Sequence, residues 1–71
     1  MAYKSANGAV QPNAVLRGGP LDGEQRHIDT RGAIGIEAGP NRAIYRPTAE
    51  LDSEYPALAV WAYDHAETEA G

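Results

Sequence analysis

The chain has 71 residues, of which 42% are hydrophobic, with ten acidic and six basic side chains, no cysteine and a formal net charge of −4. This length allows one small domain, which buries about 60% of the surface that its unfolded chain exposes. The lack of cysteine excludes disulfides and most zinc sites, and the acidic balance disfavours contact with nucleic-acid phosphates. Association with a partner or with itself is the remaining way to add to so small a core.

The charges are divided along the chain. Residues 1–46 carry all six basic groups against four acidic ones, and residues 47–71 carry six acidic groups and no basic one. Such halves suit contact between subunits or with a charged neighbour, and solvated faces are the alternative interpretation. No apolar run approaches the roughly 20 residues of a membrane span and no signal segment stands at the start. We therefore expect a soluble chain made in a cytoplasm, without membrane contact.

Residues 1–13, MAYKSANGAVQPN, show neither helical nor strand periodicity and predict an extended N-terminal arm. Tyr3 and Val10 are its only sizeable apolar side chains. An arm of this composition is either a terminus without fixed structure or a segment that becomes ordered against a neighbour. In the second case Tyr3 and Val10 are the expected anchors.

A glycine-rich turn separates two short runs that alternate like strands, residues 14–17 and 24–29. Neither run has two clearly different faces, which predicts edge positions for both. The turn consists of Gly18, Gly19, Pro20, Leu21, Asp22 and Gly23. Its glycines accept positive φ, Pro20 suits the second position of a turn, and Leu21 is expected to close one end of the core.

The same GGPLDG stretch does not fit a phosphate-binding loop. It lacks the glycine spacing of known phosphate loops, carries Asp22 where an anion would bind, and precedes no long helix. The stretch therefore predicts a folding turn, in which Asp22 accepts backbone N–H bonds.

The middle of the chain predicts a strand, a turn and a second strand. Ile34 and Ile36 lie two residues apart and therefore on one side of a short strand, which a turn at residues 39–41 follows. Residues 42–47 alternate like a strand that ends at Pro47, and an acidic connection, residues 48–56, comes next.

Residues 57–65 form the longest strand pattern, with apolar side chains on both faces. A chain of this size can hardly cover both faces, so Trp61 and Tyr63, together with Tyr45 on the neighbouring strand, are expected to form a surface that meets a partner. The alternative is that these aromatic residues line the core. A helix over residues 55–69 is disfavoured by Pro56 and by the β-branched and aromatic residues that follow it. Residues 66–71 predict an acidic tail.

No pattern predicts catalysis, a cofactor or a metal site. The candidate metal ligands are His27 with Asp29, and Asp64 with His65 and Glu67. His27 and Asp29 share one face of a strand, but two ligands do not make a structural site. There is no cysteine nucleophile, and neither serine has a histidine in a matching pattern. Tyr45 lies between Arg42 and Arg46 and could stack on a base, but the acidic second half argues against nucleic acid.

The run VLRGGPLDGEQRHID, followed by AIYRPTAEL and a last strand with tryptophan and tyrosine, resembles a group of short proteins of actinobacteria and their tailed phages. The likeness covers roughly residues 15–63, and its specific element is the GGPLDG turn. It implies a strand, the turn, a second strand and later strands with aromatic residues. Where such proteins occur in phage structural operons, the likeness also implies a small component of the virion.

Together these observations predict a mainly β protein, either a small antiparallel sheet or a partly open barrel. The expected parts are an arm (residues 1–13), a β domain (14–65) and an acidic tail (66–71). The expected function is non-enzymatic: a minor capsid or decoration protein of the virion that binds and stabilises the major capsid protein of a bacteriophage, assembled in the host cytoplasm. Another virion protein is an alternative partner, and the chain could also associate with itself. The alternative is an intracellular acidic regulator or inhibitor that binds a host protein.

Overall fold

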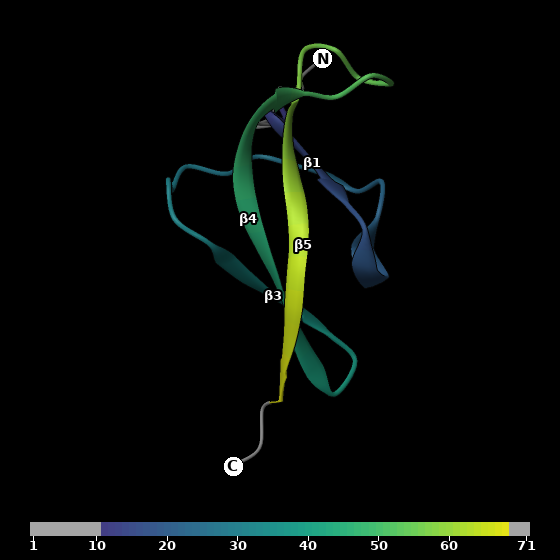
Figure 1. The fold of residues 1–71 in the computed structure, drawn as a ribbon, viewed down its shortest axis with the longest axis vertical. Helices are drawn as coiled ribbons and strands as arrows, with labels where there is room; N and C mark the ends of the chain where they lie inside the picture. Colours follow the sequence, from purple (N-terminus) through teal and green to yellow (C-terminus); the bar gives the residue numbers. More distant parts are fainter. Residues whose placement is uncertain (1–10, 69–71) are drawn as a thin grey trace, which may run out of the picture.

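A computed structural model describes residues 11–68 of the chain, and these residues form one five-stranded β-sheet (Figure 1). The strands are β1 (Ala14–Arg17), β2 (Gln25–Arg26), β3 (Ile34–Ala38), β4 (Asn41–Leu51) and β5 (Ala59–Thr68), with a single 3-10 turn, η1 (Gly19–Leu21), after β1. Their order across the sheet is β2-β1-β5-β4-β3, so β2 and β3 are the edges and the sheet is not closed into a barrel. The prediction of a mainly β chain is confirmed.

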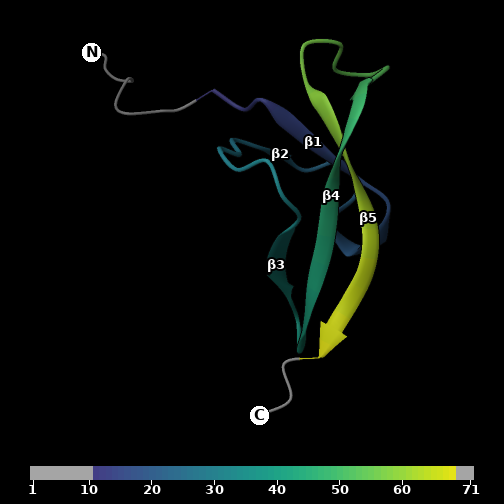
Figure 2. The ribbon, with the colours of Figure 1, turned by 60° about the vertical axis from the view of Figure 1, so that its left-hand side comes forward.

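The sheet is mixed, which corrects the prediction of an antiparallel sheet. β1 runs parallel to β5, with Val15 beside Val60 and Leu16 beside Trp61, whereas the other three pairs of strands are antiparallel. A parallel pair needs a long crossover, and here β2, β3 and β4 lie within it. The loop of residues 27–33 carries the chain from one edge strand to the other (Figure 2), and its Ile28 packs against the core.

The GGPLDG stretch is a folding turn, as its residues predict. Gly18, Gly19 and Gly23 have φ values of 85°, 68° and 90°, a region that favours glycine because a Cβ is strained there. An oxygen of the Asp22 carboxylate accepts a hydrogen bond from the Gly18 N–H at 2.7 Å. Leu21 is half-buried and packs against the core, as expected. The turn reverses the chain between β1 and β2.

The strand, turn and strand expected in the middle of the chain are β3 and β4, which pair as a hairpin. Ala38 pairs with Asn41 across a two-residue turn, in which Gly39 has a φ of 68° and Pro40 follows. Glycine at the first position is typical of a type II′ turn, and the proline ring fixes the negative φ that such a turn has at its second position. The prediction that this strand ends at Pro47 is wrong, because β4 continues to Leu51 through a shift in register. Pro47 has no N–H to donate, and the neighbouring Thr48 hydroxyl instead donates to the Val60 carbonyl at 2.8 Å.

β5 is shifted along the chain relative to its predicted range. It begins at Ala59 and includes residues 66–68, which the sequence assigned to the tail; these pair with the first residues of β4. Tyr45 pairs with Tyr63 and Ile44 pairs with His65, so Asp64 is an extra residue in the strand, as in a β-bulge. β5 is the central strand of the sheet.

β1 is not an edge strand, which corrects a second prediction. It lies between β2 and β5, and Ala14, Val15 and Leu16 are all buried. The weak alternation of this strand has a simple cause, because both of its faces are covered. Its two faces meet different parts of the molecule.

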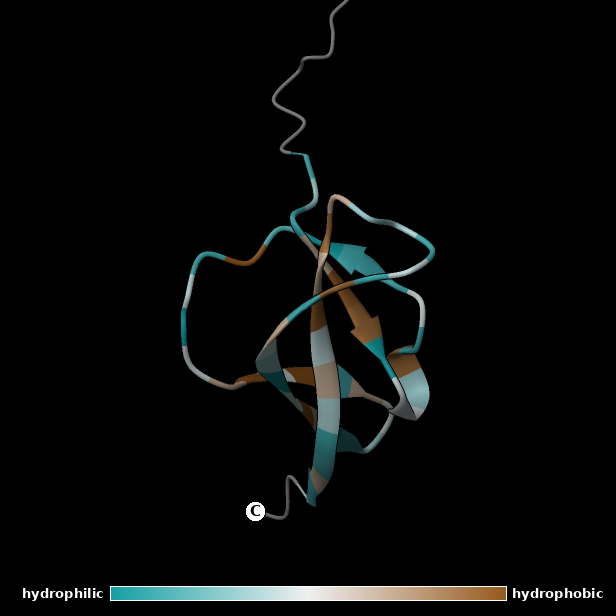
Figure 3. Ribbon diagram, turned by 45° about the horizontal axis from the view of Figure 1, so that its top comes forward, coloured by the Kyte–Doolittle hydropathy of each residue, from teal (hydrophilic) through white to brown (hydrophobic). Residues whose placement is uncertain are grey.

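One face of the sheet carries the core. The buried core residues are Ala14, Leu16, Ala43, Tyr45 and Trp61, and partly buried side chains from β3, the turn and the loop of residues 27–33 pack against them. Figure 3 shows hydrophobic residues along the central strands and hydrophilic ones toward the end of β5. Val15 and Arg17 lie on the opposite face of β1. On that face Val15 is buried and Arg17 binds the loop of residues 52–58.

Residues 11–68 contain no helix long and apolar enough to cross a membrane.

Candidate functional site

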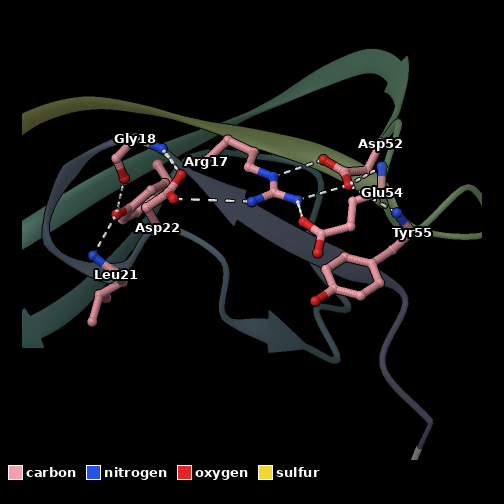
Figure 4. A network of polar contacts seen from close by, with 8 residues as sticks. Arg17, Gly18, Leu21, Asp22, Asp52, Glu54 and Tyr55 are labelled. Carbon is pink, nitrogen blue, oxygen red and sulfur yellow. Dashed lines mark hydrogen bonds and ion pairs between the residues drawn. The ribbon is translucent and has the colours of Figure 1, made fainter.

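Arg17, the last residue of β1, is the centre of a polar network (Figure 4). Its Nε donates to Oδ1 of Asp52 at 2.7 Å and its Nη2 donates to Oδ2 of Asp52 at 2.8 Å. Nη2 also donates to the Glu54 carboxylate at 2.9 Å, and the guanidinium carbon lies 5.7 Å from the centroid of the Tyr55 ring. A two-pronged arginine–carboxylate contact fixes geometry as well as charge. The network therefore holds the loop after β4 against β1.

Asp52 organises the loop itself. Its Oδ2 accepts hydrogen bonds from the backbone N–H groups of Glu54 and Tyr55, both at 2.9 Å, in the manner of an Asx turn. The loop closes through the N–H of Asp52, which donates to the Leu58 carbonyl at 2.9 Å. Asp52 is only 6% exposed, so its charge depends on these partners.

The pKa values in the network follow from these contacts. The hydrogen bonds from Arg17, followed by those from the Tyr55 and Glu54 backbones, hold the pKa of Asp52 well below its usual range. The hydrogen bonds to Asp52 and Glu54 raise the pKa of the Arg17 guanidinium above its ordinary value. Both groups are charged throughout the physiological range, which suits a structural clamp and not a proton-transfer group.

Tyr45 ties the GGPLDG turn to the core. Its hydroxyl donates to the Gly18 carbonyl at 2.7 Å and accepts the Leu21 N–H at 3.1 Å. Its ring meets the Tyr63 ring edge-on, with centroids 5.5 Å apart. Burial raises the pKa of the Tyr45 phenol. The hydroxyl thus satisfies two backbone groups that the turn leaves without a strand partner.

An open groove of about 530 Å³ adjoins the Arg17 network. Its lining residues are Gln11, Pro12, Gln25, Glu54, Tyr55, Pro56, Ala57 and Leu58. Its walls are largely apolar, and Glu54 and Tyr55 belong both to the groove and to the contacts of Arg17. A shallow groove with few polar groups can hold an extended chain segment, whereas it does not enclose a small molecule.

Of the five residues predicted to bind a partner, three lie within residues 11–68. Tyr3 and Val10 lie outside the described residues. Tyr45 is 0% exposed and Trp61 is 6% exposed, so their expected exposure is wrong, and Tyr63 is half-buried between them and the turn. Leu21 of the turn and Ile28 of the loop of residues 27–33 pack against the core on this face, and the loop of residues 52–58 binds Arg17 on the other face.

Arg17, Asp52 and Tyr55, and the groove beside them, are not among the residues predicted from the sequence to bind a partner. The stretch DSEYP, residues 52–56, carries a recognisable signal, because an aspartate before a proline-containing turn commonly accepts backbone N–H bonds. Its partner Arg17 is 35 residues away, and no local pattern indicates that distant pairing.

Two histidines lie in small polar clusters near the surface. His27 Nε2 lies 2.7 Å from a carboxylate oxygen of Asp29. His65 lies 2.6 Å from Asp64 through Nδ1, and the hydrogen bond to Asp64 raises the pKa of its imidazole. Within residues 11–68, no group of three or more histidine, aspartate or glutamate side chains is arranged to hold a metal ion.

Ion pairs within the folded chain join its basic first part, residues 1–46, to its acidic second part, residues 47–71. Arg17 binds Asp52 and Glu54, and Arg46 lies 3.2 Å from Asp64. Each of these contacts joins a basic group of residues 1–46 to an acidic group of residues 47–71. Some of the charged groups that were expected to contact a neighbour therefore form ion pairs within the chain itself.

Comparisons of the chain with known protein families, with curated proteins and with solved structures give no match.

Proposed function

We propose that this chain is a non-enzymatic binding protein that acts as a minor capsid or decoration protein of an actinobacterial tailed phage, in which it binds and stabilises major capsid subunits. The proposal combines the resemblance of the GGPLDG region with the shape of the folded chain. In this role the protein works by covering surface on a neighbour and not by chemistry.

The groove is the observation that carries the proposal. It is open, apolar and bounded by Pro12, Tyr55 and Pro56, whose side chains are stiff and lose little entropy when a partner covers them. The Arg17 clamp holds Tyr55 and the loop in place before binding, which lowers the cost of association. A segment of a capsid subunit lying in this groove would cover the apolar walls.

Repetition over a shell makes a modest contact sufficient. Each groove is small beside the roughly 800 Å² that each partner of a stable complex buries. Many copies on a symmetric shell add such contacts through avidity, with each copy joining neighbouring subunits. The predicted arm, residues 1–13, would add contacts beyond the groove, and Gln11 and Pro12 at its end line that groove.

The alternative, an acidic regulator that mimics a polyanion, has less support. Asp52, Glu54 and Asp64 are half of the acidic groups in residues 47–71, and all three bind arginines of their own chain. A polyanion mimic needs those charges to face outward.

Binding of the purified protein to isolated phage capsids tests the proposal through the groove. Ala57 is exposed in the groove, so Ala57→Glu places a charge on its apolar wall. Ala49→Glu makes the same change at an exposed position of β4 that does not line the groove, and serves as the matched control. We expect co-sedimentation with capsids for the unmodified protein and for Ala49→Glu, and its loss for Ala57→Glu.

Failure of all three proteins to sediment with capsids would overturn the proposal. Equal binding of all three proteins would show that the groove is not the surface that contacts the capsid. Circular dichroism of both variants verifies that neither substitution unfolds the sheet.

A further inference from the structure

The two edges of the sheet are built differently. The β2 edge has two residues, Gln25 and Arg26, both with long polar side chains, and Arg26 forms an ion pair with Glu24 at 2.9 Å. The β3 edge has five residues, contains neither lysine nor proline, and has Gly35 without a side chain near its centre. Proteins normally guard edges with short strands and charges, and the β3 edge has little of this protection.

The hydrogen-bonding groups of this edge follow from its hairpin. A two-residue turn is closed by a hydrogen-bonded pair, which here is Ala38 with Asn41. The bonds alternate along an antiparallel pair, so Ile36 and Ile34 also face β4, while the N–H and C=O groups of Gly35 and Glu37 point outward. Within residues 11–68, Gly35 and Glu37 make no backbone hydrogen bond outside this strand pair.

We propose that β3 pairs with β3 of a second copy of the chain, antiparallel, about a two-fold axis at Ile36. This register places Ile36 opposite Ile36 of the second copy, Ile34 opposite Ala38, and Gly35 opposite Glu37. The outward groups of Gly35 and Glu37 then exchange hydrogen bonds, four in the whole interface, and each apolar residue meets another apolar residue. The one charged residue of the strand faces a glycine and not its own copy.

The position of Arg42 adds charge complementarity to this register. Arg42 lies opposite Glu37 on β4, and its aliphatic stem crosses directly over Gly35, where a Cβ would collide with it. Across the two-fold axis, Glu37 of the second copy lies beside Gly35 on the same face. The stem of Arg42 therefore runs toward the second copy's Glu37 carboxylate. Because a guanidinium has five N–H donors, this contact can coexist with contacts of Arg42 in its own chain.

The apolar face of β3 supports the same partner. Ile34, Ile36 and Ala38 are only half-buried although they pack against the core. Pairing with a second copy places an identical row of side chains beside them on the same face of a continuous sheet. The interface is small, which predicts a weak dimer that depends on concentration. This inference does not rest on the proposed function.

Light scattering during size exclusion, from about 1 µM to about 1 mM, tests the dimer over the range of weak affinities. We expect the unmodified chain to shift from monomer to dimer. Glu37→Arg sets two arginines against each other at both ends of the interface, and Arg42→Glu does the same with two glutamates. Each variant alone should dimerise at least about tenfold more weakly. An equimolar mixture of the two should form a heterodimer, because every contact across the axis is then between opposite charges.

The mixture separates contact between copies from contact within one chain, since each variant keeps its own like-charged pair between β3 and β4. Gln25→Lys at the β2 edge is the control and should leave the dimer unchanged. Amide exchange gives a reading that needs no variant: the Gly35 and Glu37 amides should become protected as concentration rises, and the Gln25 amide should not.

A monomer at every concentration would overturn the proposal, as would a mixture that stays monomeric or a dimer that Gln25→Lys disrupts.

Discussion

Arg17 and Asp52 form a two-pronged ion pair across 35 residues of sequence, with Nε 2.7 Å from Oδ1 and Nη2 2.8 Å from Oδ2. The pair joins the end of β1 to the loop that follows β4. Asp52 is almost fully buried, so the arginine supplies the positive charge that its carboxylate requires. This contact fixes the loop over one face of the sheet and, with it, one wall of the groove.

Replacement of Arg17 should be the most damaging of the arginine substitutions. Arg17→Met keeps the aliphatic stem but leaves the Asp52 carboxylate buried without its cation. Thermal unfolding followed by circular dichroism should show a melting temperature at least about 5 °C lower. The control is Arg26→Met, which removes an exposed ion pair with Glu24 and should change the melting temperature little. Equal shifts for the two variants would contradict the assigned role of Arg17.

The stability of the protein should fall in acid because of Asp52. Its folded-state pKa lies below its ordinary value, so the contribution of the ion pair is fully present above about pH 4, the value in an unfolded chain. The contribution declines as the pH falls further and is lost when Asp52 itself becomes protonated. Melting temperatures from pH 2 to pH 7 should therefore decrease in the acid part of the range. Asp52→Asn should flatten that part of the curve, and an unchanged curve would exclude Asp52 as the titrating group.

Gly19→Ala should destabilise the turn for two reasons. The φ of 68° costs about 1–2 kcal/mol for a residue with a Cβ, and that Cβ would collide with the Tyr63 ring. Together with the cost of overpacking, the expected loss in the free energy of unfolding is about 3 kcal/mol. Gly23→Ala is the control: its φ is 90°, but the nearest atom to its Cβ would be Arg17 Nη1 at 3.8 Å. In urea unfolding, the free energy of unfolding of Gly19→Ala should be clearly lower than that of Gly23→Ala. The reverse order would contradict the predicted collision with the Tyr63 ring.

Tyr45→Phe removes the hydroxyl that binds the Gly18 carbonyl and the Leu21 N–H. Two backbone groups of the turn then lose their partner, at a cost of about 1–3 kcal/mol in the free energy of unfolding. Tyr63→Phe is the matched control, because residues 11–68 give the Tyr63 hydroxyl no hydrogen-bond partner. Chemical denaturation should separate the two variants, and similar losses would show that ring packing alone stabilises the turn.

His65 should titrate above the ordinary pH range of histidine. The hydrogen bond to Asp64 favours the protonated ring, so the pKa of His65 is raised, and the stabilisation is present below about pH 6.5 and is lost as the pH rises through the raised value. Nuclear magnetic resonance of the His65 ring protons gives this pKa directly. Asp64→Asn should lower it, whereas an unchanged titration would place the cause elsewhere.

Local features of the fold could be predicted from the sequence. The range of β1 agrees with its prediction, and the GGPLDG turn takes the positive φ values that its glycines suggested. Both features depend on residues close together in the chain, where backbone sterics decide the outcome. The acceptor role of Asp22 toward Gly18 follows from the same local chemistry.

Features that depend on distant contacts could not be predicted. Trp61 and Tyr45 are buried because the GGPLDG turn and the loop of residues 27–33 pack against their face of the sheet, whereas the pairing of Arg17 with Asp52 holds the loop of residues 52–58 at the opposite face. Strand periodicity shows which residues share a face but not what lies over it. The parallel pairing of β1 with β5 likewise depends on the path of the whole crossover.

The number of copies of this chain on purified phage particles tests the proposed function most directly. Quantitative mass spectrometry of washed particles should find the chain in many copies, in a fixed ratio to the major capsid protein. Its absence from the particles, with the chain recovered only in the soluble fraction of the host, would contradict the proposal.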